Sequence, residues 1–178
     1  MHLTRQSTVW ILLSCAPLLL GGAGDPGLLL ELDSERFELR ARDLASGAEG
    51  PVLRVVLGSP AHPTPRGEFP LHTWVQRPDW KPGPVARARG ARPQPPSDDG
   101  PLGLGALPFA GGEFSLHGGA NPILLGKPVS LGCARATDAD LMRLVAWLEE
   151  REALAARARD VGGELHTPFR RPARIVVR

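Results

Sequence analysis

Short apolar segments, separated by glycine and proline, constrain this sequence more than any other feature. The chain has 21 glycines and 19 prolines among its 178 residues. Both residue types interrupt regular elements but suit turns, where glycine supplies unusual backbone angles and proline fixes one of them. The pattern therefore favours a loop-rich β protein over a helical bundle.

Alternating residue types predict a β meander after the N-terminal segment. Residues 36–42 place apolar side chains on one side and charged ones on the other, which is the two-residue period of a half-buried strand. Apolar runs at 28–32 and 52–57 fit strands on either side, and turn residues at 46–51 precede the last. The further predicted strands are 68–75, in which Pro70 indicates an edge or a bulge, 113–117, 129–133 and 174–178.

One main helix is predicted shortly after residue 133. Its apolar face is formed by Leu141, Leu144, Val145 and Leu148, at helical spacing. Thr137 is placed to cap the first turn, paired with Asp140, and Gly162-Gly163 would stop any continuation. The predicted fold class is therefore mainly β, a sandwich or barrel with one main helix.

The segment 78–101 is rich in proline and arginine and predicts a long surface loop. Loops of this length are functional lids or disordered segments, and the sequence leaves both open. Trp74 and Trp80 lie near its start and either stack on a ligand or belong to the core or rim. His62 either lines a cleft or lies in a solvated loop.

Residues 1–24 have the pattern of a secretory signal peptide. Arg5 precedes an apolar stretch at 9–20, and small residues follow it. The stretch is too short to span a bilayer comfortably, so we expect cleavage and one exported domain over 25–178, in the periplasm or cell envelope. A lipoprotein alternative stays open, because residues 12–15 resemble a lipobox ending at Cys15.

Charge and composition argue against several classes of partner and cofactor. The formal net charge is +2, and no basic helix or aromatic-basic pattern indicates nucleic-acid binding. A single cysteine outside the predicted signal and scattered histidines make a poor zinc site. We therefore expect no metal, no cofactor and no stable membrane span, and the oligomeric state leaves no trace in the sequence.

Cys133 is the residue that points most directly to chemistry. Once Cys15 is removed with the signal, Cys133 is a lone thiol in an oxidising compartment, which is either a liability or a nucleophile. A thiol reacts as its thiolate and needs a neighbouring base. His117, followed by Gly118 and one loop before Cys133, is the candidate general base. The alternative is a buried cysteine near a structural histidine.

The residues around Cys133 suggest how a substrate would be held. Gly132 clears space beside the thiol, and the N–H groups of Leu131, Gly132 and Cys133 are candidates for an oxyanion hole. Arg135 would either hold a substrate carboxylate or anchor its loop.

This stretch also resembles a known family. His117-Gly118, an Asn-Pro loop and then Ser130-Leu131-Gly132-Cys133-Ala134-Arg135 resemble the H-G…S-x-G-C-x-R pattern of the L,D-transpeptidase catalytic domain (YkuD-type). The resemblance extends over about 28–178. Further matching pieces are Gly58 with the TPxGxF-like residues 64–69, the PLG-like residues 101–103, and Asp138, Asp140 and Leu141.

The resemblance implies a β-sandwich-like fold and a cysteine acyltransferase acting on peptidoglycan stem peptides. Cys133 would be the nucleophile, His117 the general base and Gly118 the residue whose backbone orients it, with Ser130 and Arg135 shaping the site. The thioacyl-enzyme would pass to an amine on another stem, giving a 3–3 crosslink, or on an envelope protein.

Two other activities remain possible on the same fold. In an L,D-carboxypeptidase or endopeptidase, water would replace the amine, and a non-catalytic domain would only bind the wall. The chain departs from the family pattern at Leu131, where a polar residue is common, and at Ala134 and Ala136, where larger residues are usual. These departures bear on the acceptor and the rate more than on the reaction class.

Overall fold

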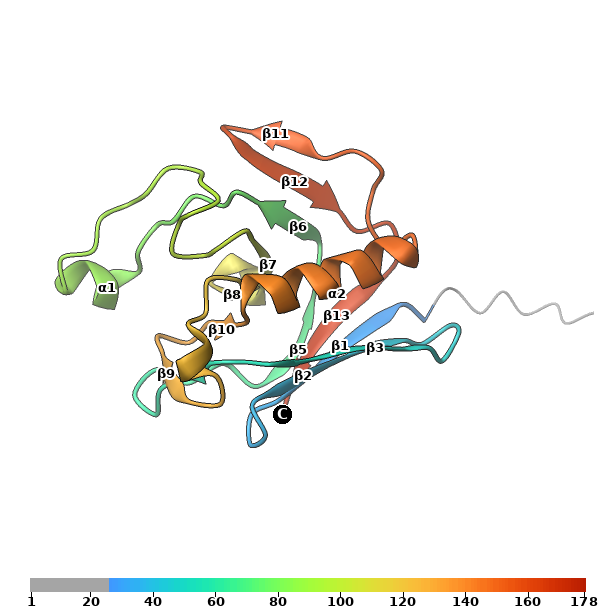
Figure 1. Ribbon diagram of the computed structural model, residues 1–178, viewed down its shortest axis with the longest axis horizontal. Helices are drawn as coiled ribbons and strands as arrows, with labels where there is room; N and C mark the ends of the chain where they lie inside the picture. The colour runs from blue at the N-terminus through green and yellow to red at the C-terminus, as the bar shows by residue number, and fades with distance from the viewer. Residues whose placement is uncertain (1–25) are drawn as a thin grey trace, which may run out of the picture.

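The computed structural model describes residues 26–178, in which two β-sheets and one long helix form the body of the molecule (Figure 1). The predicted signal at 1–24 and Cys15 lie outside the described residues. The prediction of a mainly β fold with one main helix is confirmed.

The first sheet brings the two ends of the described chain together. Its strand order is β3-β2-β1-β13-β5; β1 and β13 pair in parallel, and the other neighbours pair antiparallel. The strands are β1 (Leu28–Asp33), β2 (Glu38–Asp43), β3 (Glu49–Arg54), β5 (Gly67–Pro70) and β13 (Ala173–Val177). The predicted meander forms β1 to β3. Arg171 donates to both carboxylate oxygens of Asp43, at 2.8 and 3.1 Å, and ties the start of β13 to the end of β2.

The second sheet has the strand order β10-β8-β7-β6-β12-β11, with β10 and β8 in parallel. Its strands are β6 (Thr73–Gln76), β7 (Gly105–Phe109), β8 (Phe114–His117), β10 (Ala134–Arg135), β11 (Arg159–Val161) and β12 (Glu164–Pro168). The strands β4 (Leu57–Gly58) and β9 (Pro128–Ser130) form a separate, small parallel pair, and β9 directly precedes β10 in the chain. The connections include two single turns of 3-10 helix, η1 (Ala110–Gly112) and η2 (Pro122–Leu124).

Two segments predicted as single strands are each divided, because the chain changes partners within them. After β3 the chain leaves the first sheet, and Val56 forms a bridge with Arg135 of β10. The segment 68–75 contributes β5 to the first sheet and β6 to the second, with Leu71 buried between them. The prediction of an edge at Pro70 is confirmed, since β5 is an outer strand. Apolar content alone predicts both halves as strand and carries no signal for the crossover.

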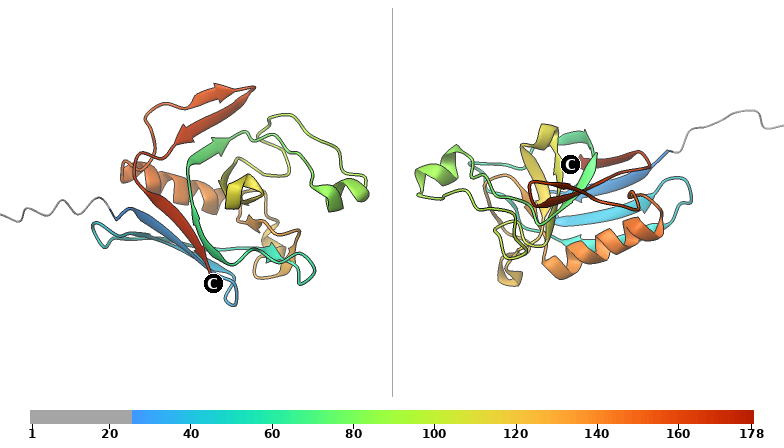
Figure 2. Two further views of the ribbon diagram at one scale, coloured as in Figure 1. Left: turned by 180° about the vertical axis from the view of Figure 1, so that it is seen from behind. Right: turned by 90° about the horizontal axis from the view of Figure 1, so that it is seen from above.

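Helix α2 (Asp138–Glu150) is the predicted main helix and runs along one side of the molecule next to β3 (Figure 2). Thr137 Oγ1 accepts from the Asp140 amide at 3.1 Å, so the predicted cap is confirmed. All four residues of the predicted apolar face are buried. Gly50 of β3 lets the ring of Trp147 lie directly on the strand, since a Cβ there would overlap the indole.

Helix α2 ends well before the glycine pair that was expected to stop any continuation. Helix α2 stops at Glu150, and Gly162-Gly163 instead form the turn between β11 and β12. Glu152 adopts a positive φ of 51°, and the amide of Ala153 donates to the carbonyl of Leu148 at 3.0 Å. This arrangement is a Schellman-type stop, which usually has glycine at the positive-φ position. Because that residue is glutamate here, the local sequence carries no signal for this helix end.

The segment 78–101 arches away from the body and returns to it (Figure 1). It contains the short helix α1 (Pro84–Ala88). Trp80 and Gln94 exchange two backbone hydrogen bonds of 2.9 Å, which close the base of the arch. We call residues 78–101 the arch.

Candidate active site

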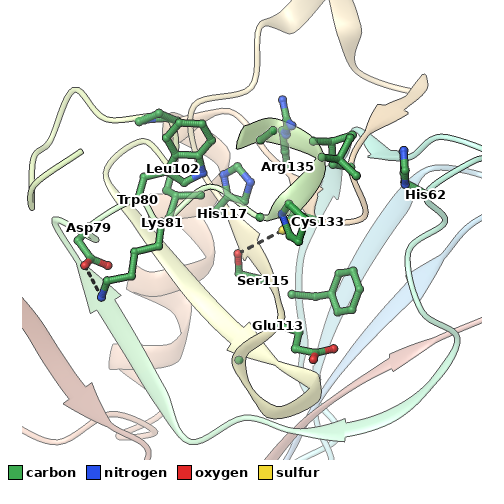
Figure 3. Close-up of a pocket in the computed structure, with 18 residues that line it drawn as sticks. His62, Asp79, Trp80, Lys81, Leu102, Glu113, Ser115, His117, Cys133 and Arg135 are labelled. Atoms are coloured by element: carbon green, nitrogen blue, oxygen red, sulfur yellow. Dashed lines mark hydrogen bonds and ion pairs between the residues drawn. The ribbon is translucent and has the colours of Figure 1, made fainter. Parts of the chain in front are cut away.

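A pocket of about 650 Å³ lies between the arch and the second sheet. The arch contributes Asp79, Trp80 and Lys81 to its lining, and the sheet with its loops contributes Ser115, His117, Cys133 and Arg135 (Figure 3). Cys133 and His117, the predicted nucleophile and base, therefore face the same cavity. The parallel pairing of β8 and β10 helps to explain this, because Ala134 and Arg135 pair with Leu116 and His117, and Cys133 directly precedes that paired segment.

His117 is the last residue of β8 and is 2 % exposed. Its Nδ1 lies 2.8 Å from the carbonyl oxygen of Gly118. A carbonyl only accepts, so Nδ1 carries the hydrogen and Nε2 is left as the basic nitrogen. This contact is the one through which the Gly118 backbone would orient the ring, as the sequence predicts.

Burial, which has the larger effect, and the positive charge of Arg135 together lower the pKa of His117 to about 4. The carbonyl of Gly118 and the carboxylate of Asp138 act against this change by favouring the charged ring. The imidazole is therefore neutral at neutral pH and able to accept a proton.

Cys133 is half-buried in the loop between β9 and β10 and is the only cysteine among residues 26–178. The hydroxyl of Ser115 lies 3.8 Å from its Sγ, within the longer range of hydrogen bonds to sulfur. Sequence reasoning did not assign Ser115 to the site. The signal was present: Ser115 is two residues before His117 in a strand, and side chains two apart face the same side of a sheet.

Ser130 fixes the loop that carries the thiol. Its side chain is fully buried, and Oγ donates to the carbonyl of Cys133 at 2.7 Å while it accepts from the amide of Gly132 at 3.0 Å. The Gly132 amide is therefore occupied and is not available to an oxyanion, contrary to expectation. Within residues 26–178, the amides of Leu131 and Cys133 donate to no backbone carbonyl in the turns and loops.

Gly132 is required by the geometry of this loop. Its φ is +119°, and a Cβ at this position would lie 2.5 Å from the ring of Phe114. Glycine avoids both the strain and the overlap. The sequence predicts that Gly132 clears space beside the thiol, and the group that comes close to it there is the ring of Phe114.

Arg135 is held by its backbone and presents its side chain to the pocket. Its amide and carbonyl exchange hydrogen bonds of 2.9 and 2.8 Å with Val56, and β10 pairs it in register with His117. The guanidinium Nε is buried without a hydrogen-bond partner among the described residues. A buried donor of this kind favours an incoming anionic or carbonyl group.

The arch lines one side of the pocket with both charged and aromatic side chains. Lys81 Nζ and Asp79 Oδ2 form an ion pair of 2.6 Å, and Trp80 lies beside them in the lining. Trp74, by contrast, is 2 % exposed and belongs to the core. His62 is half-buried and lines the pocket from the opposite loop, so the cleft alternative describes its position.

Residues 26–178 contain no group of three or more His, Cys, Asp or Glu side chains arranged to hold a metal ion. Over the same residues, no helix has the length and apolar character needed to cross a bilayer.

Solved structures with the same fold were found among L,D-transpeptidases. An L,D-transpeptidase from Mycobacterium tuberculosis H37Rv matches with a TM-score of 0.55 at 15% identity, covering 85% of this chain and 57% of that one. A mutant L,D-transpeptidase from Enterococcus faecium matches with a TM-score of 0.55 at 15% identity, and the match covers 85% of this chain and 50% of that one. A third match is L,D-transpeptidase 3 from Mycobacterium tuberculosis in complex with a faropenem-derived adduct. Its TM-score is 0.53 at 17% identity, and the match covers 85% of this chain and 60% of that one.

This chain thus spans between half and about three fifths of the length of these proteins. No curated protein matches it. The family model described as YkuD, L,D-transpeptidase catalytic domain, matches residues 36–162, which include every site residue described above. Since that match covers more than half of the chain, this protein belongs to the L,D-transpeptidase catalytic domain family.

Proposed function

We propose that this protein is an exported, cysteine-dependent L,D-transpeptidase that acts on peptidoglycan stem peptides through a thioacyl-enzyme. One observation carries the proposal: Cys133 and a neutral, tautomer-fixed His117 line one pocket. Membership of the family supports the reaction class. The signal-peptide pattern at 1–24 supports export to the periplasm or cell envelope.

In the first half-reaction Nε2 of His117 takes the proton from the Cys133 thiol. Sγ then bonds to the carbonyl carbon of the stem residue, and the negative charge develops on the carbonyl oxygen. The amides of Leu131 and Cys133 are the available donors for that oxygen. The C–N bond to the terminal D-residue breaks, and Nε2 gives its proton to the departing amine.

In the second half-reaction an acceptor amine attacks the thioester carbon and gives a proton to Nε2. The C–S bond breaks, the proton returns to sulfur, and the product carries a new amide bond. The acceptor is another stem, which gives a crosslink, or an amine of an envelope protein. Arg135, with its unpartnered Nε, is suited to a carboxylate or carbonyl of the donor stem.

The test is to incubate the purified protein with tetrapeptide stems and an amine acceptor and to identify products by mass spectrometry. We expect an amide-linked product with loss of the terminal D-residue. Cys133→Ala and His117→Gln should abolish it. His72→Gln, which removes an exposed imidazole, is the matched control and should retain activity.

The alternative outcomes are distinct. A free acid in place of the amide-linked product would make the protein a hydrolase on the same fold. Turnover that survives Cys133→Ala would overturn both activities, and an absence of turnover together with stem binding would indicate a wall-binding domain. A carbapenem mass adduct on Cys133 is a quicker test for an accessible, activated thiol.

A further inference from the structure

The carboxylate of Asp138, the first residue of α2, joins two loops that meet behind His117. Its Oδ1 accepts from the amide of Leu104 at 2.8 Å and from the amide of Gly119 at 3.2 Å. Asp138 is therefore bonded both to the loop before β7 and to the loop that follows β8.

Glycines surround this carboxylate and permit the contact. A Cβ on Gly118 or on Gly103 would overlap Oδ1 of Asp138. Gly103 and Gly119 also have positive φ values of 64° and 71°. Any other residue at Gly103 or Gly118 would push the backbone off the carboxylate, so the two loops and the helix start form one closely fitted unit.

The Gly119 amide bonded by Asp138 belongs to the same peptide group as the Gly118 carbonyl, which accepts the Nδ1 hydrogen of His117 at 2.8 Å. A peptide group is planar and trans, so its N–H and C=O point in opposite directions. Fixing the N–H on Asp138 therefore aims the C=O at the imidazole. The Gly118 amide is held separately by the carbonyl of Gly105 at 3.1 Å.

The same contact strengthens the acceptor electronically. A peptide group whose N–H donates to a carboxylate is polarised, and its carbonyl becomes a better acceptor. The negative charge also raises the pKa of His117 against the opposing effects of burial and Arg135. Asp138 thus stabilises the imidazolium that forms when His117 takes a proton.

We propose that Asp138 is a positioning residue, which acts through the Gly118–Gly119 peptide group to fix the tautomer and orientation of His117 and to stabilise its protonated form. The proposal rests on the proposed function of His117 as the general base. Asp138 itself is not among the residues that line the pocket.

The test compares Asp138→Ala and Asp138→Asn with Asp140→Asn. Asp140 is a matched control, because it is an acidic residue of the same helical turn whose carboxylate bonds to Thr137 and Arg143 instead of the loops. The first measurement is the rate constant of Cys133 acylation by a carbapenem at saturating reagent. We expect a loss of about ten- to a hundredfold in Asp138→Ala, the range for a hydrogen bond to a charged group. Asp138→Asn should lose less, and Asp140→Asn should stay within about twofold.

The second measurement is nitrogen NMR of the His117 ring in the unreacted protein, which reports the tautomer without any activity. We expect a single Nδ1–H tautomer in the wild type and in Asp140→Asn, and a mixture of tautomers in Asp138→Ala. A wild-type acylation rate and an unchanged tautomer in both Asp138 variants would overturn the proposal.

Two further outcomes separate this proposal from the assignment of the base. If Asp138→Ala does not fold, Asp138→Asn carries the test, since it keeps an oxygen acceptor and removes only the charge. Loss of the charge lowers the pKa of His117, so the acylation rate of Asp138→Asn must be lost at a lower pH than that of Asp140→Asn. Loss at the same pH in the two variants would overturn the proposal. If His117→Gln acylates at the wild-type rate, the assignment of the base is wrong, whereas the tautomer measurement still decides whether Asp138 positions the ring.

Discussion

Acidification should destabilise this protein through His117 in particular. The ring is 2 % exposed, and burial together with Arg135 lowers its pKa from the usual 6.5 to about 4. The unfolded chain therefore binds a proton at this residue at a higher pH than the folded protein does. Stability is complete above the unfolded value and is lost progressively as the pH falls from about 6.5 to about 4.

The magnitude follows from the two pKa values. The difference between 6.5 and about 4 is worth about 3 kcal/mol of unfolding free energy at ~1.4 kcal/mol per pH unit. Because the loss develops across that whole interval, about 2 kcal/mol of it should appear between pH 7 and pH 5. His117→Gln removes the titrating group and should remove this part of the pH dependence.

The assay is urea unfolding of the wild type and of His117→Gln at pH 7 and pH 5. The wild type should lose about 2 kcal/mol more than the variant over this interval. Arg135→Gln should reduce the loss, since the cation no longer disfavours the charged ring. Equal pH dependence in the wild type and His117→Gln, or a His117 ring that titrates near 6.5 by NMR, would refute the reasoning.

Three other substitutions have definite expected effects. Arg171→Ala leaves the buried carboxylate of Asp43 unpaired and should lower the unfolding free energy by about 3 kcal/mol, measured by urea unfolding at pH 7; a change below about 1 kcal/mol would contradict this. Gly132→Ala combines a φ of +119° with overlap of an aromatic ring, and should slow carbapenem acylation by more than about tenfold in a protein that stays folded. Ser115→Ala removes the hydroxyl 3.8 Å from Sγ of Cys133 and should slow alkylation by iodoacetamide about threefold at neutral pH, whereas an unchanged rate would show that the hydroxyl does not stabilise the thiolate.

The elements that could be predicted are those with a strong local signal. Helix α2 is an example, because the residues of its apolar face and its cap at Thr137 all lie within one short segment of the sequence. Its end is a counterexample, since a glutamate adopts the positive φ that glycine usually takes. Strand β7 was not predicted at all, although Leu107 and Phe109 are buried, because glycine and proline interrupt its pattern.

The site shows the same division between local and distant information. The pair Cys133 and His117 was identified from residue chemistry and spacing, and both line one pocket. The sequence left open whether residues 78–101 form a lid or a disordered segment, and only the structure places Trp80 and Lys81 in the lining of the pocket that contains Cys133. The predicted oxyanion donor at Gly132 failed for a related reason, because its amide bonds to the buried hydroxyl of Ser130.

The sequence by itself determined the residue types that chemistry needs: a lone thiol at Cys133, an imidazole at His117 and glycines where the backbone must turn or come close. It also determined the family, because these residues occur in one short, ordered stretch. Only the tertiary structure decided how they are supported. The parallel pairing of β8 and β10 sets the thiol beside Ser115, and the start of α2 brings Asp138 behind the Gly118 peptide. These contacts join separate elements that lie 18 and 19 residues apart in the chain, and no local pattern encodes a distance between separate elements.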